Sequence, residues 1–313
     1  MSKHRPMRPI QILLVSGLAL VAGCAGGATE SDSERSPEAL ESAAATITSA
    51  DILDRIGVMA HDSMRGRRTP SPELEEVAAW VAGEFAALGL RPAGDQGSFI
   101  QRYPVPDSDG ETAPNVVGIL DGSDPALRGE YLVYSAHMDH VGVRRPDESG
   151  DSIYNGADDD ASGTATVMEV AQAMASLEVA PRRSVIFLIV SGEERGLWGS
   201  DHFAANPPVS MDAMVANLNA DMVGRNWPDT IVAIGKEHST LGATLDSLNA
   251  ARPDLGMTAI DDIWPDERFY FRSDHYNFAR NGVPVLFFFN GTHEDYHQAS
   301  DELDKIDTEK TAR

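Results

Sequence analysis

The chain has 313 residues, 42% of them hydrophobic, which is enough for one large globular domain or two small ones. Its formal net charge of −24 argues against nucleic acid and against an anionic membrane surface as partners, because both carry charge of the same sign. The single cysteine, Cys24, excludes an intramolecular disulfide and a cysteine-ligated zinc site, so any metal must bind nitrogen and oxygen ligands.

The first residues have the pattern of a targeting signal. A basic start with Lys3, Arg5 and Arg8 precedes the apolar stretch from Ile10 to Ala22, which is too short to span a membrane comfortably. The stretch ends in V-A-G-C and resembles a bacterial lipoprotein signal, in which Cys24 becomes the lipidated first residue. An ordinary signal peptide cleaved nearby is the alternative. We therefore expect a signal over residues 1–23 and a lipid anchor in the bacterial cell envelope, facing the periplasm or exterior.

Residues 24–48 are rich in small and polar residues and predict a flexible tether. The catalytic domain is expected over residues 49–313. It begins with a helix over 51–62, where apolar residues recur at helical spacing. A second helix begins after Ser71, whose side chain can cap it, and ends at Gly89.

Strands and helices alternate in the rest of the chain. Strands are predicted over residues 115–120, 131–136, 184–190, 213–219, 231–234 and 285–289. Helices are predicted over residues 163–177, 197–205, 239–251 and 275–280. The continuous apolar run V-I-F-L-I-V fits a central strand buried on both faces. This alternation predicts an α/β fold with a mostly parallel sheet and helices on both faces.

Five potential metal ligands lie at or after the ends of these segments. They are His137, Asp159, Glu194, Asp221 and His297. Four follow predicted strands directly or in the next loop, and the remaining aspartate lies in the long loop after the first of these strands. Open α/β sheets bind ligands at the carboxyl ends of their strands, so these side chains should meet at one edge. Two histidines and three carboxylates could hold two metal ions.

The charges of these residues also fit a site with two metal ions. Three carboxylates and a bridging hydroxide would balance the four positive charges of two divalent ions. Imidazole and carboxylate suit zinc best, with manganese or cobalt as substitutes. Glu193, beside Glu194, is then a candidate general base. Each element also has an ordinary alternative: paired glutamates usually begin a solvated helix, and D-D-D usually forms a surface turn.

Six motifs occur in order along the chain. They are A-H-M-D-H-V-G, N-G-A-D-D-D-A-S-G, S-G-E-E-R-G-L-W-G-S, N-A-D-M-V-G, R-S-D-H-Y-N-F and D-Y-H-Q-A-S-D. In this combination the chain resembles the co-catalytic dizinc exopeptidases of the bacterial leucyl-aminopeptidase type, a family that includes glutamate carboxypeptidase-like members. The resemblance implies a mixed, mainly parallel sheet between helices.

The resemblance also implies a role for each matching residue. His137 and Asp221 would bind one zinc ion, Glu194 and His297 the other, and Asp159 would bridge both. Glu193 would be the general base, Asp139 would orient His137, and Tyr296 and His275 would lie near the substrate.

The chain departs from the family pattern in two places. The short stretch between Tyr103 and Tyr131 leaves no room for the protease-associated domain that some relatives insert. Relatives usually continue with another helix after the D-K-I-D segment, whereas this sequence stops at Arg313. Either the sequence is a fragment or that helix is missing.

The resemblance implies an aminopeptidase that acts on peptides. A carboxypeptidase or a glutaminyl-cyclase-like enzyme on the same fold is the alternative, and Arg268 or Arg272 could then clamp a terminal carboxylate. A catalytically inactive binding protein is a further alternative. The sequence does not indicate the oligomeric state.

The anchor is tested by Cys24→Ser. The substitution removes the acceptor for the lipid, so the protein should leave the membrane fraction or remain unprocessed, whereas the wild type should resist a salt wash. Fractionation followed by immunoblotting measures this. Identical partitioning of the two proteins would show that Cys24 carries no anchor.

Overall fold

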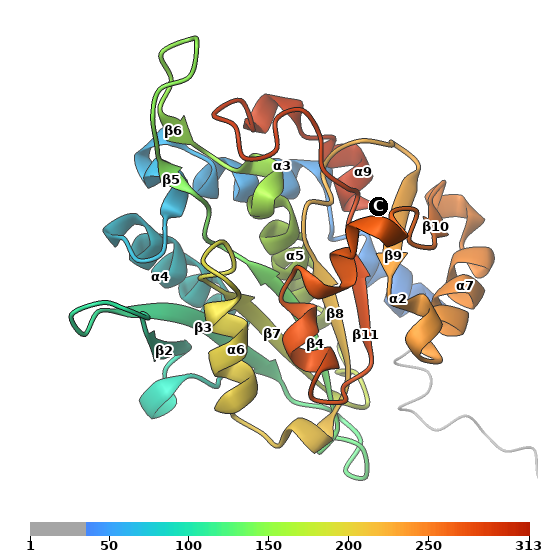
Figure 1. Ribbon diagram of the computed structural model, residues 1–313. Coiled ribbons are helices and arrows are strands. Elements are labelled where there is room, and N and C mark those ends of the chain that lie inside the picture. The colour runs from blue at the N-terminus through green and yellow to red at the C-terminus, as the bar shows by residue number, and fades with distance from the viewer. Residues whose placement is uncertain (1–35) are drawn as a thin grey trace, which may run out of the picture.

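The computed structural model describes residues 36–313 (Figure 1). Its helices are α2 (Pro37–Ala44), α3 (Ser49–Met59), α4 (Pro72–Ala87), α5 (Gly163–Ala175), α6 (Trp198–Ala205), α7 (Leu241–Ala251), α8 (His275–Ala279) and α9 (Thr308–Ala312). Its strands are β1 (Arg91–Pro92), β2 (Ile100–Pro104), β3 (Thr112–Leu120), β4 (Tyr131–His137), β5 (Gly142–Val143), β6 (Ile153–Tyr154), β7 (Ser184–Val190), β8 (Met214–Ala220), β9 (Thr230–Ile234), β10 (Thr258–Ile260) and β11 (Val285–Phe288).

Nine of the strands form one mixed sheet. Its order is β1-β3-β7-β4-β8-β11-β9-β10, with β2 paired to β3. The central strands β7, β4, β8 and β11 run parallel to one another, while β3 and β9 are antiparallel to their neighbours β7 and β11. The predicted mixed, mainly parallel sheet is confirmed. The carboxyl ends of the four central strands therefore lie at one edge.

Helices cover both faces of this sheet (Figure 1). On one face, apolar residues of α3, α4 and α5 pack against alternate side chains of β3, β4 and β7, such as Phe187. On the other face, Phe203 of α6 and Phe278 of α8 pack against the intervening side chains, such as Leu188. Because both faces are buried, every residue of β7 is buried, as its continuous apolar sequence predicts.

The predicted helix boundaries agree closely with the structure. The Ser71 hydroxyl accepts a hydrogen bond from Leu74 N at the start of α4, and Gly89 follows the helix with φ +73°. The predicted tether is too long, because α2 occupies its second half and packs against α5. Ser36 caps α2, and Pro37 suits its first turn. The prediction of a tether did not take these two helix-start signals into account.

Two expectations concern the ends of the chain. The proposed signal with Cys24 lies outside the described residues. The short helix α9 follows the D-K-I-D segment. Within residues 36–313, no helix combines the length and apolar character needed to cross a membrane.

Gly163, the first residue of α5, joins the fold to the candidate site. A Cβ atom at this position would overlap the carboxylate of Asp160 and the carbonyl of Ala220. Gly83, within α4, has open space instead, because apart from its chain neighbours and the backbone of its own helix no heavy atom lies within 4 Å of the position that a Cβ atom would take. The two glycines therefore respond oppositely to the same change.

We expect Gly163→Ala to lower the free energy of unfolding by about 1–3 kcal/mol, because packed backbone must move. Gly83→Ala should raise it by up to about 1 kcal/mol, because alanine favours helix. Denaturant unfolding of both variants measures the difference. Equal stabilities would contradict the tight packing at the start of α5.

Candidate metal centre

The five predicted ligands come together at the carboxyl edge of the sheet. His137 ends β4, Asp221 follows β8 directly, and Glu194 lies in the loop after β7. His297 lies in the loop after β11, and Asp159 precedes α5. The structure thus assembles from distant segments the set that the sequence singled out. It forms two groups that share Asp159.

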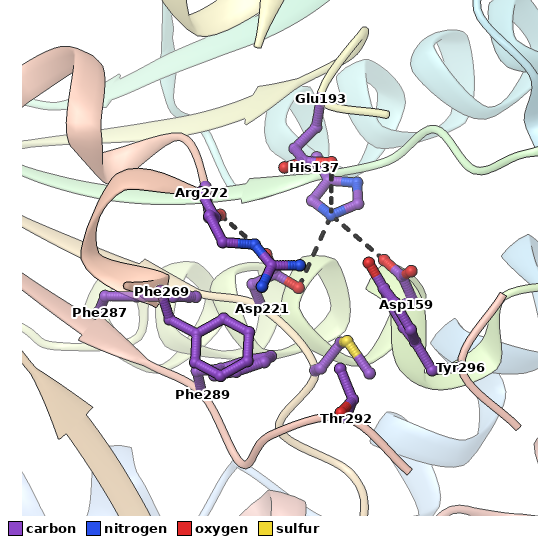
Figure 2. Close-up of a pocket in the computed structure, with 12 residues that line it drawn as sticks. His137, Asp159, Glu193, Asp221, Phe269, Arg272, Phe287, Phe289, Thr292 and Tyr296 are labelled. Atoms are coloured by element: carbon purple, nitrogen blue, oxygen red, sulfur yellow. Dashed lines mark hydrogen bonds and ion pairs between the residues drawn. The ribbon is translucent and has the colours of Figure 1, made fainter. Parts of the chain in front are cut away.

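The first group consists of His137, Asp159 and Asp221, and Figure 2 shows their side chains converging. The His137 Nε2 atom lies 3.4 Å from Asp159 Oδ1 and 3.7 Å from Asp221 Oδ1. The other oxygen of Asp221 accepts a hydrogen bond from Ser273 Oγ at 2.8 Å. This hydrogen bond leaves Oδ1 directed toward the group.

The second group contains Asp159, Glu194 and His297, joined by the unpredicted His140. The His297 Nε2 atom lies 3.1 Å from Asp159 Oδ2 and 3.1 Å from Glu194 Oε2. Asp159 therefore turns one carboxylate oxygen to each group. His297 has a left-handed backbone, with φ +56°, which is uncommon outside glycine and occurs often at functional sites.

The separations fit metal coordination. Tetrahedral zinc with bonds of about 2.0–2.2 Å holds neighbouring ligand atoms about 3.3–3.6 Å apart. The four distances given above, from 3.1 to 3.7 Å, lie close to this range. Glu194 Oε1 is also buried without a hydrogen-bond partner among the described residues. The two groups therefore suit two ions that share the carboxylate of Asp159.

Asp139 contacts His137 differently from the expectation. The nearest acceptor to His137 Nδ1 is the main-chain carbonyl of Asp139, at 3.1 Å, whereas the Asp139 carboxylate is 3.7 Å away. A proton on Nδ1 leaves the lone pair of Nε2 directed at the first group. The Asp139 carboxylate instead accepts hydrogen bonds from Thr69 Oγ1 and Glu193 N. It fixes the main chain that carries the candidate base.

Two neighbouring carboxylates, those of Asp160 and Asp301, are not part of the two metal groups. They accept hydrogen bonds from the main chain of the segments that carry the ligands. Asp160 accepts hydrogen bonds from the main-chain nitrogens of His137, Gly163 and Met222, which ties β4, α5 and the end of β8 together. Asp301 accepts hydrogen bonds from the main-chain nitrogens of residues 158 and 159. These bonds fix the position of Asp159.

Arg67 holds together the segment that follows His137 and the loop that carries Asp159. It is fully buried, and its guanidinium donates to the carbonyls of Met138 at 2.7 Å, Met59 at 3.0 Å and Gly156 at 2.9 Å, and also to that of Asn155. Met138 follows His137 in the chain, and Gly156 begins the loop that carries Asp159. A single cation thereby fixes the spacing between these two ligand segments.

Glu193 lies beside the first group. Its Oε2 atom is 3.9 Å from His137 Nε2, and its side chain is 14% exposed. Burial raises the pKa of the Glu193 carboxyl well above its usual range, and the nearby Asp274 and Asp221 raise it further. A carboxylate with a raised pKa is a stronger base. Glu193 therefore lies beside the first group, where its carboxyl could act on a group bound there.

A small cavity of about 40 Å³ opens beside the first group. Its apolar wall consists of Met222, Phe269, Phe287 and Phe289. Arg272 and Tyr296 also line the cavity, and Figure 2 shows them on opposite sides of Asp221's carboxylate, with the phenylalanine rings below Arg272. The cavity therefore combines an apolar wall, a cation and a hydroxyl next to the candidate metal groups.

Two of the expectations for this region differ from the structure. His275 does not line the cavity: its ring stacks on the inner side of Phe287 at 4.3 Å, and its Nε2 lies 2.8 Å from the carbonyl of Tyr270. Burial lowers the pKa of His275 to about 4, so the ring is neutral. Arg268 does not line the cavity either, and its guanidinium stacks on Phe271.

The sequence analysis missed four residues that organise the centre: Arg67, Thr69, His140 and Asp301. His140 stands within A-H-M-D-H and could have been found from that motif. Asp301 ends the D-Y-H-Q-A-S-D motif and could have been found there too. Arg67 and Thr69 lie in a segment with no ligand-like pattern, and only the tertiary structure reveals their contacts.

Curated relatives include metallopeptidases. A probable zinc metalloprotease of Leptosphaeria maculans is 32% identical over 154 residues, which cover 48% of this chain and 34% of that protein. Leucine aminopeptidase 1 of Penicillium rubens is 25% identical over 290 residues, which cover 86% of this chain and 71% of that protein. The chain spans only 34%, 38% and 43% of the length of the first three curated relatives.

Solved structures show the same fold. The LapA aminopeptidase of Legionella pneumophila matches with a TM-score of 0.66 and 24% identity, over 88% of this chain and 71% of that one. The glutaminyl cyclase of Porphyromonas gingivalis matches with a TM-score of 0.67 and 16% identity, over 85% of this chain and 94% of that one. These identities support the fold alone.

A match to a family model identifies the family of this chain. The model of peptidase family M28 matches residues 115–313, which is more than half of the chain. The matched region contains both candidate metal groups and Glu193. The chain therefore belongs to peptidase family M28.

Proposed function

We propose that this protein is a dizinc aminopeptidase that removes residues from the amino end of peptides. The observation that carries the proposal is the pair of ligand groups that share Asp159, with Glu193 beside one of them. Relatives named as zinc metalloproteases and a leucine aminopeptidase support it. His137 and Asp221 would hold one zinc ion, and Glu194 and His297 the other. Manganese or cobalt could replace zinc.

Bound zinc would lower the pKa of a water molecule and polarise the carbonyl of the substrate. Glu193 takes a proton from the attacking water and delivers it to the nitrogen of the leaving amine. Burial raises the pKa of Tyr296, so its hydroxyl stays protonated and can donate a hydrogen bond to the substrate. The apolar wall of the cavity suits an apolar side chain on the residue that is removed.

The acidic surroundings favour attack at an amino end. A free α-amine is cationic near neutral pH, and Glu193 and Asp221 offer carboxylates beside the cavity. Arg272 supports the alternative of a carboxypeptidase, because its guanidinium lines the same cavity and could bind a terminal carboxylate. The fold shared with a glutaminyl cyclase keeps that activity as another alternative.

Two further parts of the proposal concern the whole protein. Retention of the five ligands and Glu193 favours an enzyme over an inactive binding protein. The signal-like start of the chain supports a lipid-anchored protein of the cell envelope that acts on peptides outside the cytoplasm.

The role of Glu193 is tested by Glu193→Gln, which keeps the size of the side chain but cannot accept a proton. We expect kcat to fall by at least about 10²-fold with the zinc content unchanged. Glu178→Gln, at an exposed position away from the site, is the matched control and should keep the wild-type rate. A fully metallated Glu193→Gln protein with a near-normal rate would remove Glu193 from the mechanism.

The end of the peptide that is attacked is tested with blocked substrates. Acetylation of the α-amine of a good peptide substrate should abolish cleavage, while amidation of its carboxyl end should leave the rate nearly unchanged. Mass spectrometry of the digest identifies the residue released. Cleavage that survives acetylation but not amidation would instead make the protein a carboxypeptidase and assign the terminal carboxylate to Arg272.

A further inference from the structure

The buried imidazole of His140 is not explained by the family roles described above. It is 1% exposed, and neither of its ring nitrogens has a hydrogen-bond partner among the described residues. Buried polar groups in proteins are nearly always satisfied, so such a ring requires an explanation. Its surroundings supply one, because the ring faces the second ligand group.

The distances place His140 within that group. Its Nδ1 atom lies 2.9 Å from Glu194 Oε1 and 3.6 Å from Asp159 Oδ2. These two atoms of His140 and Glu194 are close, yet their orientation does not satisfy a hydrogen bond, and both remain without a hydrogen-bond partner among residues 36–313. Ligand atoms that surround one ion have this property: they lie near each other but point at a common centre.

The other imidazole of the group is arranged in the same way. The rings of His140 and His297 lie edge to face, with centroids 5.6 Å apart and an interplanar angle of 70°. Glu194 lies between them, with Oε1 near His140 and Oε2 near His297. Ligand atoms of His140, Asp159, Glu194 and His297 all lie within 4.8 Å of one another.

The backbone holds the His140 ring in this orientation. Gly156 has φ +57°, and a Cβ atom there would overlap Cγ and Cδ2 of His140 at 2.5 and 2.6 Å. The carbonyl of Gly156 is in turn fixed by Arg67. The absence of a side chain at Gly156 therefore makes the space in which the ring lies against Glu194.

We propose that His140 is a fourth protein ligand of the metal ion held by Asp159, Glu194 and His297. This proposal rests on the dinuclear site of the proposed function. It makes the two sites unequal: the second is closed by four protein ligands, whereas within residues 36–313 the first has only His137, Asp159 and Asp221. Closed four-ligand sites are typical of structural zinc, while catalytic zinc keeps a position for water. The second ion then binds more tightly and remains in place while the first site exchanges water and substrate.

The experiment counts imidazole ligands by X-ray absorption at the zinc edge. Apoprotein loaded with one equivalent of zinc should show two imidazoles per zinc, from His140 and His297. Loading with two equivalents should lower the average to three imidazoles per two zinc ions. These measurements need no variant. One imidazole per zinc at both loadings would overturn the proposal, even for a protein with two bound ions and full peptidase activity.

His140→Phe extends the test, because phenylalanine fills the space of the ring without a ligand atom. We expect one imidazole per zinc at one equivalent, and a weakening of the tighter zinc affinity by more than about 10²-fold, the upper range for loss of a residue that only supports a ligand. A competing chelator measures the affinity. The partly exposed His202, in α6 beside Tyr103, provides the control His202→Phe, which should leave both readouts unchanged.

Two other outcomes are distinguishable. Unchanged imidazole counts with zinc affinity lowered less than about 10²-fold would make His140 a residue that only positions Glu194, and would overturn the proposal. A wild-type protein that binds fewer than two zinc ions would overturn the dinuclear site itself, and with it the proposed function.

Discussion

The structure depends on the concentration of buried negative charge at one edge of a sheet. Asp159, Asp221, Glu193 and Glu194 meet there with little exposure to solvent. The nearby buried cation, Arg67, donates its hydrogen bonds to carbonyl groups and not to these carboxylates. Burial of several like charges together is costly, so two divalent cations would stabilise this arrangement.

Carboxylates in this protein therefore have two distinct uses. Asp159 and Asp221 leave oxygens directed into the candidate metal groups, whereas Asp160 and Asp301 use theirs to accept main-chain hydrogen bonds from the ligand loops. The second use makes the first possible, because each ligand loop lacks regular structure and needs fixed partners. His140 lies within one of these motifs, and the role that we propose for it is one that the family pattern does not assign.

Much of the fold could be predicted because its central strands are buried on both faces and so appear as continuous apolar runs. The ligand positions followed from the ends of those runs. The short edge strands β1 and β10 lack such runs and were not predicted. Helix α2 was not predicted either, because its segment has few large apolar residues. The contacts of Arg67 with the ligand loops and the stacking of His275 behind Phe287 escaped too, because they depend on residues far apart in the sequence.

The position of β11 has a consequence for how the chain folds. This late strand lies between β8 and β9, which precede it in the sequence, and its following loop carries His297 (Figure 1). During synthesis β8 and β9 therefore lack this shared neighbour until residues 285–288 have emerged. Insertion of β11 between β8 and β9 forms contacts between residues far apart in the sequence. Such contacts form slowly during folding. The loop after this strand also brings His297, so the candidate metal centre cannot be complete before this part of the sheet has formed.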